Sequence, residues 1–171
     1  KTRVAAEMGT DAATHVYRRC VERTLERISA LRAETALCVE PADAADRIRT
    51  WLGPTWSALA QCGVSLGERL TDAVAGAFTQ GARRVVVIGT DSPWINAARV
   101  EEAFFILERT DLGLGPASDG GYYLVGLAQP APDLFDGIAW STGQVLHQTL
   151  AKARALGMTV SLLPEGYDID R

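Results

Sequence analysis

The residues that decide the fold are the run RVVVI at positions 84–88 and the segment GTDSP that follows it at positions 89–93. Four successive β-branched residues leave the run without a polar face, so we expect a strand that is covered on both sides. Asp91 then lies just past the carboxyl end of that strand, where ligands bind in open α/β sheets. A carboxylate there is a natural ligand for a hard cation such as Mg²⁺, although Asp91 could instead open a turn or cap the helix that follows Pro93.

Outward from this strand, helical and extended patterns alternate along the chain. Helices are expected over 11–31, 43–52, 66–80 and 97–108, and Ser141, with Gln144 three residues later, has the pattern of a capping box that opens a further helix. Extended runs are expected at 36–39, 112–116, 122–127 and 158–163. The alternation predicts an α/β fold, a three-layer sandwich with a mainly parallel sheet, in a single domain over residues 1–171. The runs on either side of residues 119–121 break the alternation and predict a hairpin or an antiparallel strand.

Composition excludes several classes of function. The chain has 171 residues, 47% hydrophobic and 22% charged, and its net charge of -4 is too mild for a nucleic-acid surface. No apolar run approaches the roughly 20 residues that a membrane helix needs. The three cysteines, Cys20, Cys38 and Cys62, are widely spaced and accompanied by two histidines, so no zinc site is expected. Reduced thiols of this kind are typical of a cytoplasmic protein.

A second candidate site is the segment GPASDGGYY at positions 115–123. The paired glycines Gly120 and Gly121 let a backbone approach a ligand closely. Asp119 could accept hydrogen bonds from sugar hydroxyls, and Tyr122 or Tyr123 could stack on a ring. The same segment also suits a tight hairpin, because Asp-Gly is a common turn signal and the tyrosines would then pack in the sheet.

Charged residues near the two chain ends are the remaining candidates. Asp168 and Asp170 alternate along an extended segment and could share a cation. Lys1 and Arg3 flank a hydroxyl, an arrangement that suits phosphate binding. At both ends the competing interpretation is that these charged side chains lie in solvent and bind no ligand.

The motifs, in chain order, are KTR at 1–3, LGERL at 66–70, GTDSP at 89–93, GPASDGGYYLVGL at 115–127, WST at 140–142 and DID at 168–170. This series resembles the glycosyltransferase-A-like family of rSAM/selenodomain-associated or arsenosugar-type transferases, formerly a domain of unknown function, in the nucleotide-diphospho-sugar transferase superfamily. The resemblance covers essentially the whole chain. It implies a glycosyltransferase-A-like fold whose first strand and phosphate-binding loop lie upstream of Lys1.

The resemblance also implies roles for the candidate residues. Asp91 matches the family's metal-binding aspartate, with Asp170 and its neighbour Asp168 completing the coordination of Mg²⁺ or Mn²⁺. Lys1 and Arg3 match the end of the loop that holds the nucleotide phosphates, and with Asp91 they form the expected catalytic set. The residues expected to bind substrate are Thr90, Ser92, Asp119, Gly120, Gly121, Tyr122, Trp140, Glu68 and Arg69. Trp94 departs from the small or aliphatic residue that the family has after Ser-Pro.

The implied activity is metal-dependent glycosyl transfer from a nucleoside-diphosphate sugar to a small-molecule acceptor. The alternative is nucleotidyl transfer from a nucleoside triphosphate to a phosphorylated small molecule with release of pyrophosphate, because one cation on the phosphates serves both reactions. A non-catalytic nucleotide-sugar-binding domain is a third possibility. None of these functions involves nucleic acid or a membrane span.

Overall fold

A computed structural model describes residues 9–166, and its largest sheet has four strands in the order β3-β5-β4-β6. The strands are β3 (Val85–Ile88), β5 (Tyr122–Leu127), β4 (Leu112–Pro116) and β6 (Val160–Leu162). β5 is antiparallel to both of its neighbours, whereas β4 and β6 are parallel. Hence β3, β4 and β6 share one direction, and β5 is the antiparallel strand predicted beyond residues 119–121.

Two further strands, β1 (Ala36–Val39) and β2 (Ser57–Ala60), form a separate parallel sheet. The sequence pattern predicted β1 with these bounds but did not predict β2. The sequence of β2 is SALA, which contains no β-branched or aromatic residue and therefore has weak strand propensity. Pairing with β1 in the register Ala36↔Ser57 makes this segment a strand.

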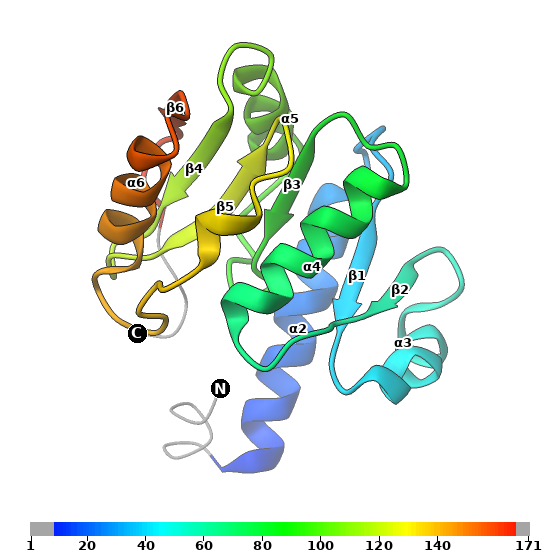
Figure 1. Ribbon diagram of the computed structural model, residues 1–171. Helices are drawn as coiled ribbons and strands as arrows, with labels where there is room; N and C mark the ends of the chain where they lie inside the picture. Colours follow the sequence, from blue (N-terminus) through cyan, green and yellow to red (C-terminus); the bar gives the residue numbers. More distant parts are fainter. Residues whose placement is uncertain (1–8, 167–171) are drawn as a thin grey trace.

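Helices cover both faces of the four-stranded sheet, which confirms the three-layer arrangement (Figure 1). α2 (Thr10–Ile28) and α5 (Ala97–Ile106) pack on one face, and α4 (Leu66–Thr79) and α6 (Val145–Ala155) pack on the other. The apolar strand β3 divides its side chains between the two layers. Val86 and Ile88 pack with the α2 and α5 core, and Val85 and Val87 pack with the α4 and α6 core.

The shorter elements are α3 (Ala45–Leu52) and the 3-10 helices η1 (Ala42–Ala44) and η2 (Pro132–Phe135). α3 is attached to α2 by Trp51, whose indole Nε1 donates a hydrogen bond of 2.9 Å to Glu22 Oε1. Within residues 9–166, no helix has both the length and the apolar character that a bilayer crossing requires.

The capping box expected at Ser141 is wrong. α6 begins at Val145, four residues later, and Ser141 has a φ of 64°, in the left-handed region that a helix N-cap does not use. The Thr142 hydroxyl instead accepts a hydrogen bond of 3.3 Å from the Gln144 N–H. A side-chain cap does open α4, where Ser65 Oγ accepts a hydrogen bond of 3.2 Å from the Glu68 N–H.

Candidate functional site

Three strands of common direction, β3, β4 and β6, end at the same edge of the sheet. Past β6 the chain continues beside β4, since Leu163 N–H donates to the Leu114 carbonyl at 2.8 Å and Gly166 N–H donates to the Pro116 carbonyl at 2.8 Å. Ser118 N–H completes the pairing with a hydrogen bond of 3.1 Å to the Gly166 carbonyl. The loops at 89–93 and 117–121 and the segment 163–166 therefore meet at the carboxyl edge of the sheet, where open α/β sheets bind ligands.

Asp91 lies in a turn at this edge. Gly89 N–H donates to the Tyr123 carbonyl at 3.2 Å, which places the end of β3 beside the start of β5. The Asp91 carboxylate folds back over Gly89, with Oδ1 close to the position that a β-carbon of residue 89 would occupy. Asn96 caps α5, accepting a hydrogen bond of 3.0 Å from the Arg99 N–H, so Asp91 is not the cap of that helix.

The neighbours of Asp91 fix its turn to the rest of the protein. Thr90 Oγ1 lies 3.4 Å from the Tyr17 hydroxyl and shares a hydrogen bond with it, which joins the turn to α2. Ser92 is completely buried, and its carbonyl accepts a hydrogen bond of 3.0 Å from the Ile95 N–H. Ser92 therefore lies in the protein interior, whereas Thr90 and Asp91, like the other residues of this motif, are partly exposed.

The Asp119 loop is a tight turn at the same edge, between β4 and β5. Asp119 is exposed, and its Oδ1 accepts a hydrogen bond of 2.9 Å from the Gly121 N–H. Gly120 has a φ of 87°, and a β-carbon there would collide with the Gly143 carbonyl. Gly120 also accepts a hydrogen bond of 2.9 Å from the Leu146 N–H, which attaches the turn to the start of α6. The hairpin expected here is confirmed, and Asp119 lies at its exposed tip.

Tyr122 and Trp140 lie in the layer formed by α4 and α6. Their rings meet edge to face at 6.3 Å, and Trp140 also contacts Phe135 at 6.4 Å. Burial raises the pKa of Tyr122 to about 12, with the Thr149 hydroxyl opposing part of the rise. Neither hydroxyl, that of Tyr122 or that of Thr149, is within ordinary hydrogen-bond geometry of a partner. The Tyr122 hydroxyl is thus a core group in this structure.

Glu68 and Arg69 lie at the carboxyl ends of the two-stranded sheet. Arg69 Nε donates a hydrogen bond of 3.0 Å to the Gly63 carbonyl, past β2, and its guanidinium forms an ion pair with Glu40, the residue after β1. Glu68 accepts a hydrogen bond of 3.0 Å from the Val64 N–H through Oε2. Both side chains therefore shape the loops that follow β1 and β2.

Four of the expected residues, Lys1, Arg3, Asp168 and Asp170, lie outside the described residues. Of the proposed metal ligands, Asp91 is the one within 9–166. In that range no three His, Cys, Asp or Glu side chains gather as a metal site would require. The oxygen chemistry of Asp91 fits a hard cation, and the remaining ligands of such a cation would come from outside this range or from a bound diphosphate.

The sequence pattern did not reveal a contact between Trp94, Tyr123 and Gly166. A β-bulge between Gly115 and Pro116 in the β4–β5 pairing places Tyr123 and Leu124 in the same core, on the α2 and α5 side. Trp94 meets the Tyr123 ring edge to face at 4.7 Å. The unusual tryptophan after Ser-Pro was a signal that a large ring fills space here.

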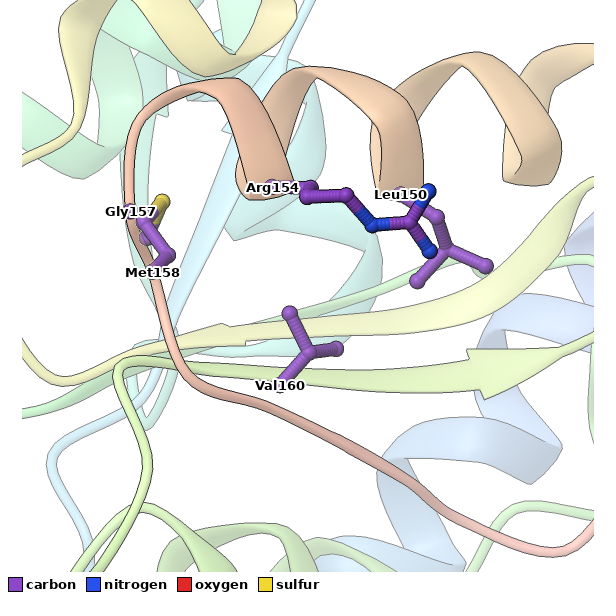
Figure 2. A pocket seen from close by; sticks show the side chains of 5 residues that line it. All are labelled: Leu150, Arg154, Gly157, Met158 and Val160. Atoms are coloured by element: carbon purple, nitrogen blue, oxygen red, sulfur yellow. The ribbon is translucent and has the colours of Figure 1, made fainter.

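A hollow of about 400 Å³ lies at the opposite edge, near the amino end of β6 (Figure 2). Leu150, Arg154, Gly157, Met158 and Val160 line it. The Arg154 side chain extends along α6 past Leu150, with Val160 below on the sheet. Because this hollow is at the amino end of a strand that shares its direction with β4, it is separate from the edge that carries Asp91.

Solved structures with this architecture include proteins that act on nucleotides. A candidate nucleotide-diphospho-sugar transferase from Desulfovibrio desulfuricans G20 is 38% identical to this chain, with a TM-score of 0.92 over 99% of this chain and 75% of that one. Molybdopterin-guanine dinucleotide biosynthesis protein A from Archaeoglobus fulgidus is similar in fold, at 15% identity and a TM-score of 0.55 over 85% of this chain and 69% of that one. A CMP:2-keto-3-deoxy-manno-octonic acid synthetase in complex with CTP is similar at 10% identity and a TM-score of 0.60, over 88% of this chain and 82% of that one.

These similarities confirm the nucleotide-diphospho-sugar transferase fold expected from the sequence. No curated protein matches the chain. The profile described as "Uncharacterized protein conserved in bacteria (DUF2064)" matches residues 24–142, and the chain belongs to this family.

Proposed function

We propose that the protein is a metal-dependent transferase that uses a nucleoside-diphosphate sugar as its donor. The observation that carries the proposal is the meeting of the Asp91 turn, the Asp119 hairpin and the segment 163–166 at one carboxyl edge of the sheet. The similarity to a candidate nucleotide-diphospho-sugar transferase at 38% identity supports the choice of donor.

In this proposal Asp91 holds Mg²⁺ or Mn²⁺ against the donor diphosphate. The bound cation would offset the negative charge that builds on the leaving diphosphate oxygens. Asp91 is suited to this task because the buried Ser92 and the contact between Thr90 and Tyr17 attach its turn to the rest of the protein, so the backbone that carries the carboxylate is positioned before the ligand arrives. Lys1, Arg3, Asp168 and Asp170 are proposed to complete the phosphate and metal site.

The exposed hairpin tip is proposed to bind the sugar or the acceptor. Asp119 Oδ1 is occupied by the Gly121 N–H, so hydrogen bonds to hydroxyl groups would be accepted mainly by its other oxygen. Holding one oxygen fixes the direction of the other, which favours recognition of a hydroxyl at a defined position. Trp140 and Tyr122 support this hairpin from the α4 and α6 layer.

Nucleotidyl transfer is the second candidate. The similarity in fold to the CMP:2-keto-3-deoxy-manno-octonic acid synthetase and to a cytidylyltransferase from Leptospira borgpetersenii favours it. The products separate the possibilities: a nucleoside diphosphate is released in glycosyl transfer, pyrophosphate in nucleotidyl transfer, and neither by a non-catalytic binding domain.

The experiment is a thermal-stability screen with uridine, guanosine, cytidine and thymidine diphosphates and their sugars, each with Mn²⁺ and with excess chelator. A ligand that binds only the native state and is present at a free concentration of 100 times its Kd adds about 2.7 kcal/mol to the free energy of unfolding, so the shift in melting temperature is easily measured. We expect stabilisation only when the metal is present. Equal stabilisation in chelator would contradict the metal role.

Asp91→Asn is the decisive variant, and Asp136→Asn is its control, because Asp136 is an exposed acid at the end of η2. We expect Asp91→Asn to abolish the metal-dependent shift while leaving the melting temperature without ligand close to that of the wild type. Asp136→Asn should retain the full shift. An unfolded Asp91→Asn protein would show that this carboxylate stabilises the turn and would count against the proposed role.

A further inference from the structure

β6 is the last strand at one side of the four-stranded sheet, and within residues 9–166 no strand pairs with its outer edge (Figure 1). On the inner edge, the Thr159 carbonyl accepts a hydrogen bond of 3.0 Å from β4, and the Leu163 N–H donates one of 2.8 Å to β4. Since alternate residues of a strand direct their backbone groups to opposite edges, Val160 and Leu162 direct theirs outward. An open edge of this kind is a template for another strand.

The hollow of about 400 Å³ beside α6 adjoins this edge (Figure 2). Val160 lines it from the sheet, and Leu150 and Met158 supply the rest of its apolar lining. Leu162 lies on the same face of the sheet as Val160, because it is two residues further along the strand, and it is 54% exposed. One edge strand therefore carries both an apolar hollow and an exposed apolar side chain.

The charged side chains near the two ends of β6 lack partners in the part of the chain that the structure describes. Arg154 lines the hollow from α6, near the amino end of the strand, and forms no ion pair with a described residue. Glu165 is exposed past the carboxyl end and likewise forms none there. Opposite charges at the two ends of one strand suit a partner strand of the same sequence that runs in the opposite direction.

We propose that the outer edge of β6 binds the same edge of a second copy of this chain, in an antiparallel pairing with its two-fold axis at Ser161. In this register Val160 faces Leu162 of the second copy, so the residues with outward backbone groups exchange their hydrogen bonds. Side chains that face each other in an antiparallel pair lie on one face, with β-carbons about 4.5–5.5 Å apart. Leu162 of the second copy therefore enters the hollow over Val160, and the two-fold symmetry fills the second hollow in the same way.

The register also brings the unpaired charges together. Glu165 and Gly157 are each four residues from Ser161, so antiparallel pairing carries Glu165 of one copy past Gly157 of the other. Gly157 lines the hollow together with Arg154, and the carboxylate of one copy thus comes beside the guanidinium of the other. A slip of one residue would set outward backbone groups against inward ones and would lose these hydrogen bonds.

The first test measures the oligomeric state of the full chain by sedimentation velocity over a range of concentrations. We expect a dimer, and we expect Leu162→Lys to weaken it at least tenfold, because an ammonium group is costly to bury in an apolar hollow. Phe105→Lys is the matched control, since Phe105 is 59% exposed on α5, a helix on the other face of the sheet. It should leave the dimer dissociation constant unchanged. Circular dichroism checks that both variants fold.

The second test exchanges the charges. Arg154→Glu and Glu165→Arg each set like charges together twice in a symmetric dimer, so each should weaken it by roughly 10-fold. The variant that carries both changes restores opposite charges at both places and should return the dissociation constant to near the wild-type value. A double variant that dimerises no better than the single ones would show that these two side chains do not meet.

The third test examines the register with Ser161→Cys. Residues that face each other in a non-hydrogen-bonded antiparallel pair have Cα atoms about 4.5 Å apart, within the range of a disulfide. Mild oxidation should therefore join two copies through the introduced thiols, which mass spectrometry identifies. The wild type measures the background from its free cysteines, and Ser118→Cys, at an exposed serine in the loop after β4, should not exceed that background.

A wild-type chain that stays monomeric at the highest concentration would overturn the proposal and would leave the edge to a strand of a different protein. A dimer that Leu162→Lys does not weaken, or that Ser161→Cys does not link, would show that the copies meet on another surface. The proposed function is independent of all three tests, because they use neither the Asp91 turn nor a bound metal ion.

Discussion

The Asp111 carboxylate accepts two hydrogen bonds from Thr159, one from its backbone N–H at 2.8 Å and one from its hydroxyl at 2.6 Å. Asp111 immediately precedes β4, and Thr159 immediately precedes β6. The pair therefore sets the register of two parallel strands at their amino ends, where Leu112 pairs with Val160. The same two strands bring the segment 163–166 to the candidate site at the opposite edge of the sheet. The contact between Asp111 and Thr159 therefore helps to set where that segment lies.

The first prediction concerns the acid stability of this pair. The Thr159 hydroxyl and backbone N–H lower the pKa of Asp111 below its ordinary value of 3.8. A carboxyl group whose pKa is lower in the folded state stabilises the fold above the unfolded pKa and loses that contribution as the pH falls through the folded pKa. Asp111→Asn should therefore be less stable than the wild type at pH 7, and the difference should shrink as the pH falls below 3.8. Urea unfolding of both proteins from pH 7 to pH 2 measures this, and a pH-independent difference would contradict it.

The sequence predicts a helix or strand of this fold where local residues determine its conformation, and fails to predict one where contacts with distant residues do. Strands 36–39, 112–116 and 122–127 were predicted with the bounds that the structure has, because apolar runs between turn residues are local signals. β2 was missed because its strand conformation comes from pairing with β1, a distant contact. The cap expected at Ser141 is absent because its spacing to Gln144 fits a capping box while its backbone is left-handed, a conformation that the spacing does not reveal.

The candidate site divides in the same way. The position of Asp91 after β3 follows from a local rule about strand ends, and the structure places it there. The tryptophan at position 94 indicates that a large ring lies after Ser-Pro, but the sequence does not indicate that this ring meets Gly166. That contact needs the register of β4 against the segment 163–166 and the bulge at Gly115, and both arise only when residues far apart in the chain pair.

The second prediction uses the buried hydroxyl of Tyr122. Burial raises its pKa to about 12, so the folded protein resists ionising it while the unfolded chain ionises it near its ordinary value of 10.0. The folded state therefore loses stability as the pH rises from 10 towards 12, since unfolding then releases a proton. Tyr122→Phe should reduce this alkaline loss and cost little at pH 7, because the hydroxyl lacks a hydrogen-bond partner in ordinary geometry. Thermal unfolding from pH 8 to pH 11 measures both effects, and a Tyr122→Phe protein that is much less stable at pH 7 would contradict the second.

The third prediction compares two glycines with positive φ. Gly120 at 87° faces the Gly143 carbonyl, whereas Gly137 at 69° faces no atom within 4 Å. Gly137→Ala should cost about 1 kcal/mol, the conformational penalty alone. Gly120→Ala must also push the 117–121 hairpin away from the loop before α6, so it should cost clearly more. Urea unfolding measures the difference, and equal losses would show that the two loops separate without cost.

The last prediction decides whether Arg69 binds substrate or builds a loop. Its guanidinium is tied to the Gly63 carbonyl and to Glu40, so Arg69→Ala should release the loop after β2 and lower stability by about 1 kcal/mol. Glu40→Gln should cost less, because Glu40 is half-exposed and a surface ion pair contributes about 0–1 kcal/mol. If Arg69 acts only by holding the loop, the metal-dependent rise in melting temperature with a nucleoside diphosphate should persist in Glu40→Gln. In Arg69→Ala this rise should become smaller, and amide exchange at Val64 should become faster in parallel. A shift that disappears in Arg69→Ala while exchange at Val64 stays at the wild-type rate would instead show that the guanidinium contacts the ligand directly, as the family resemblance implies for this position.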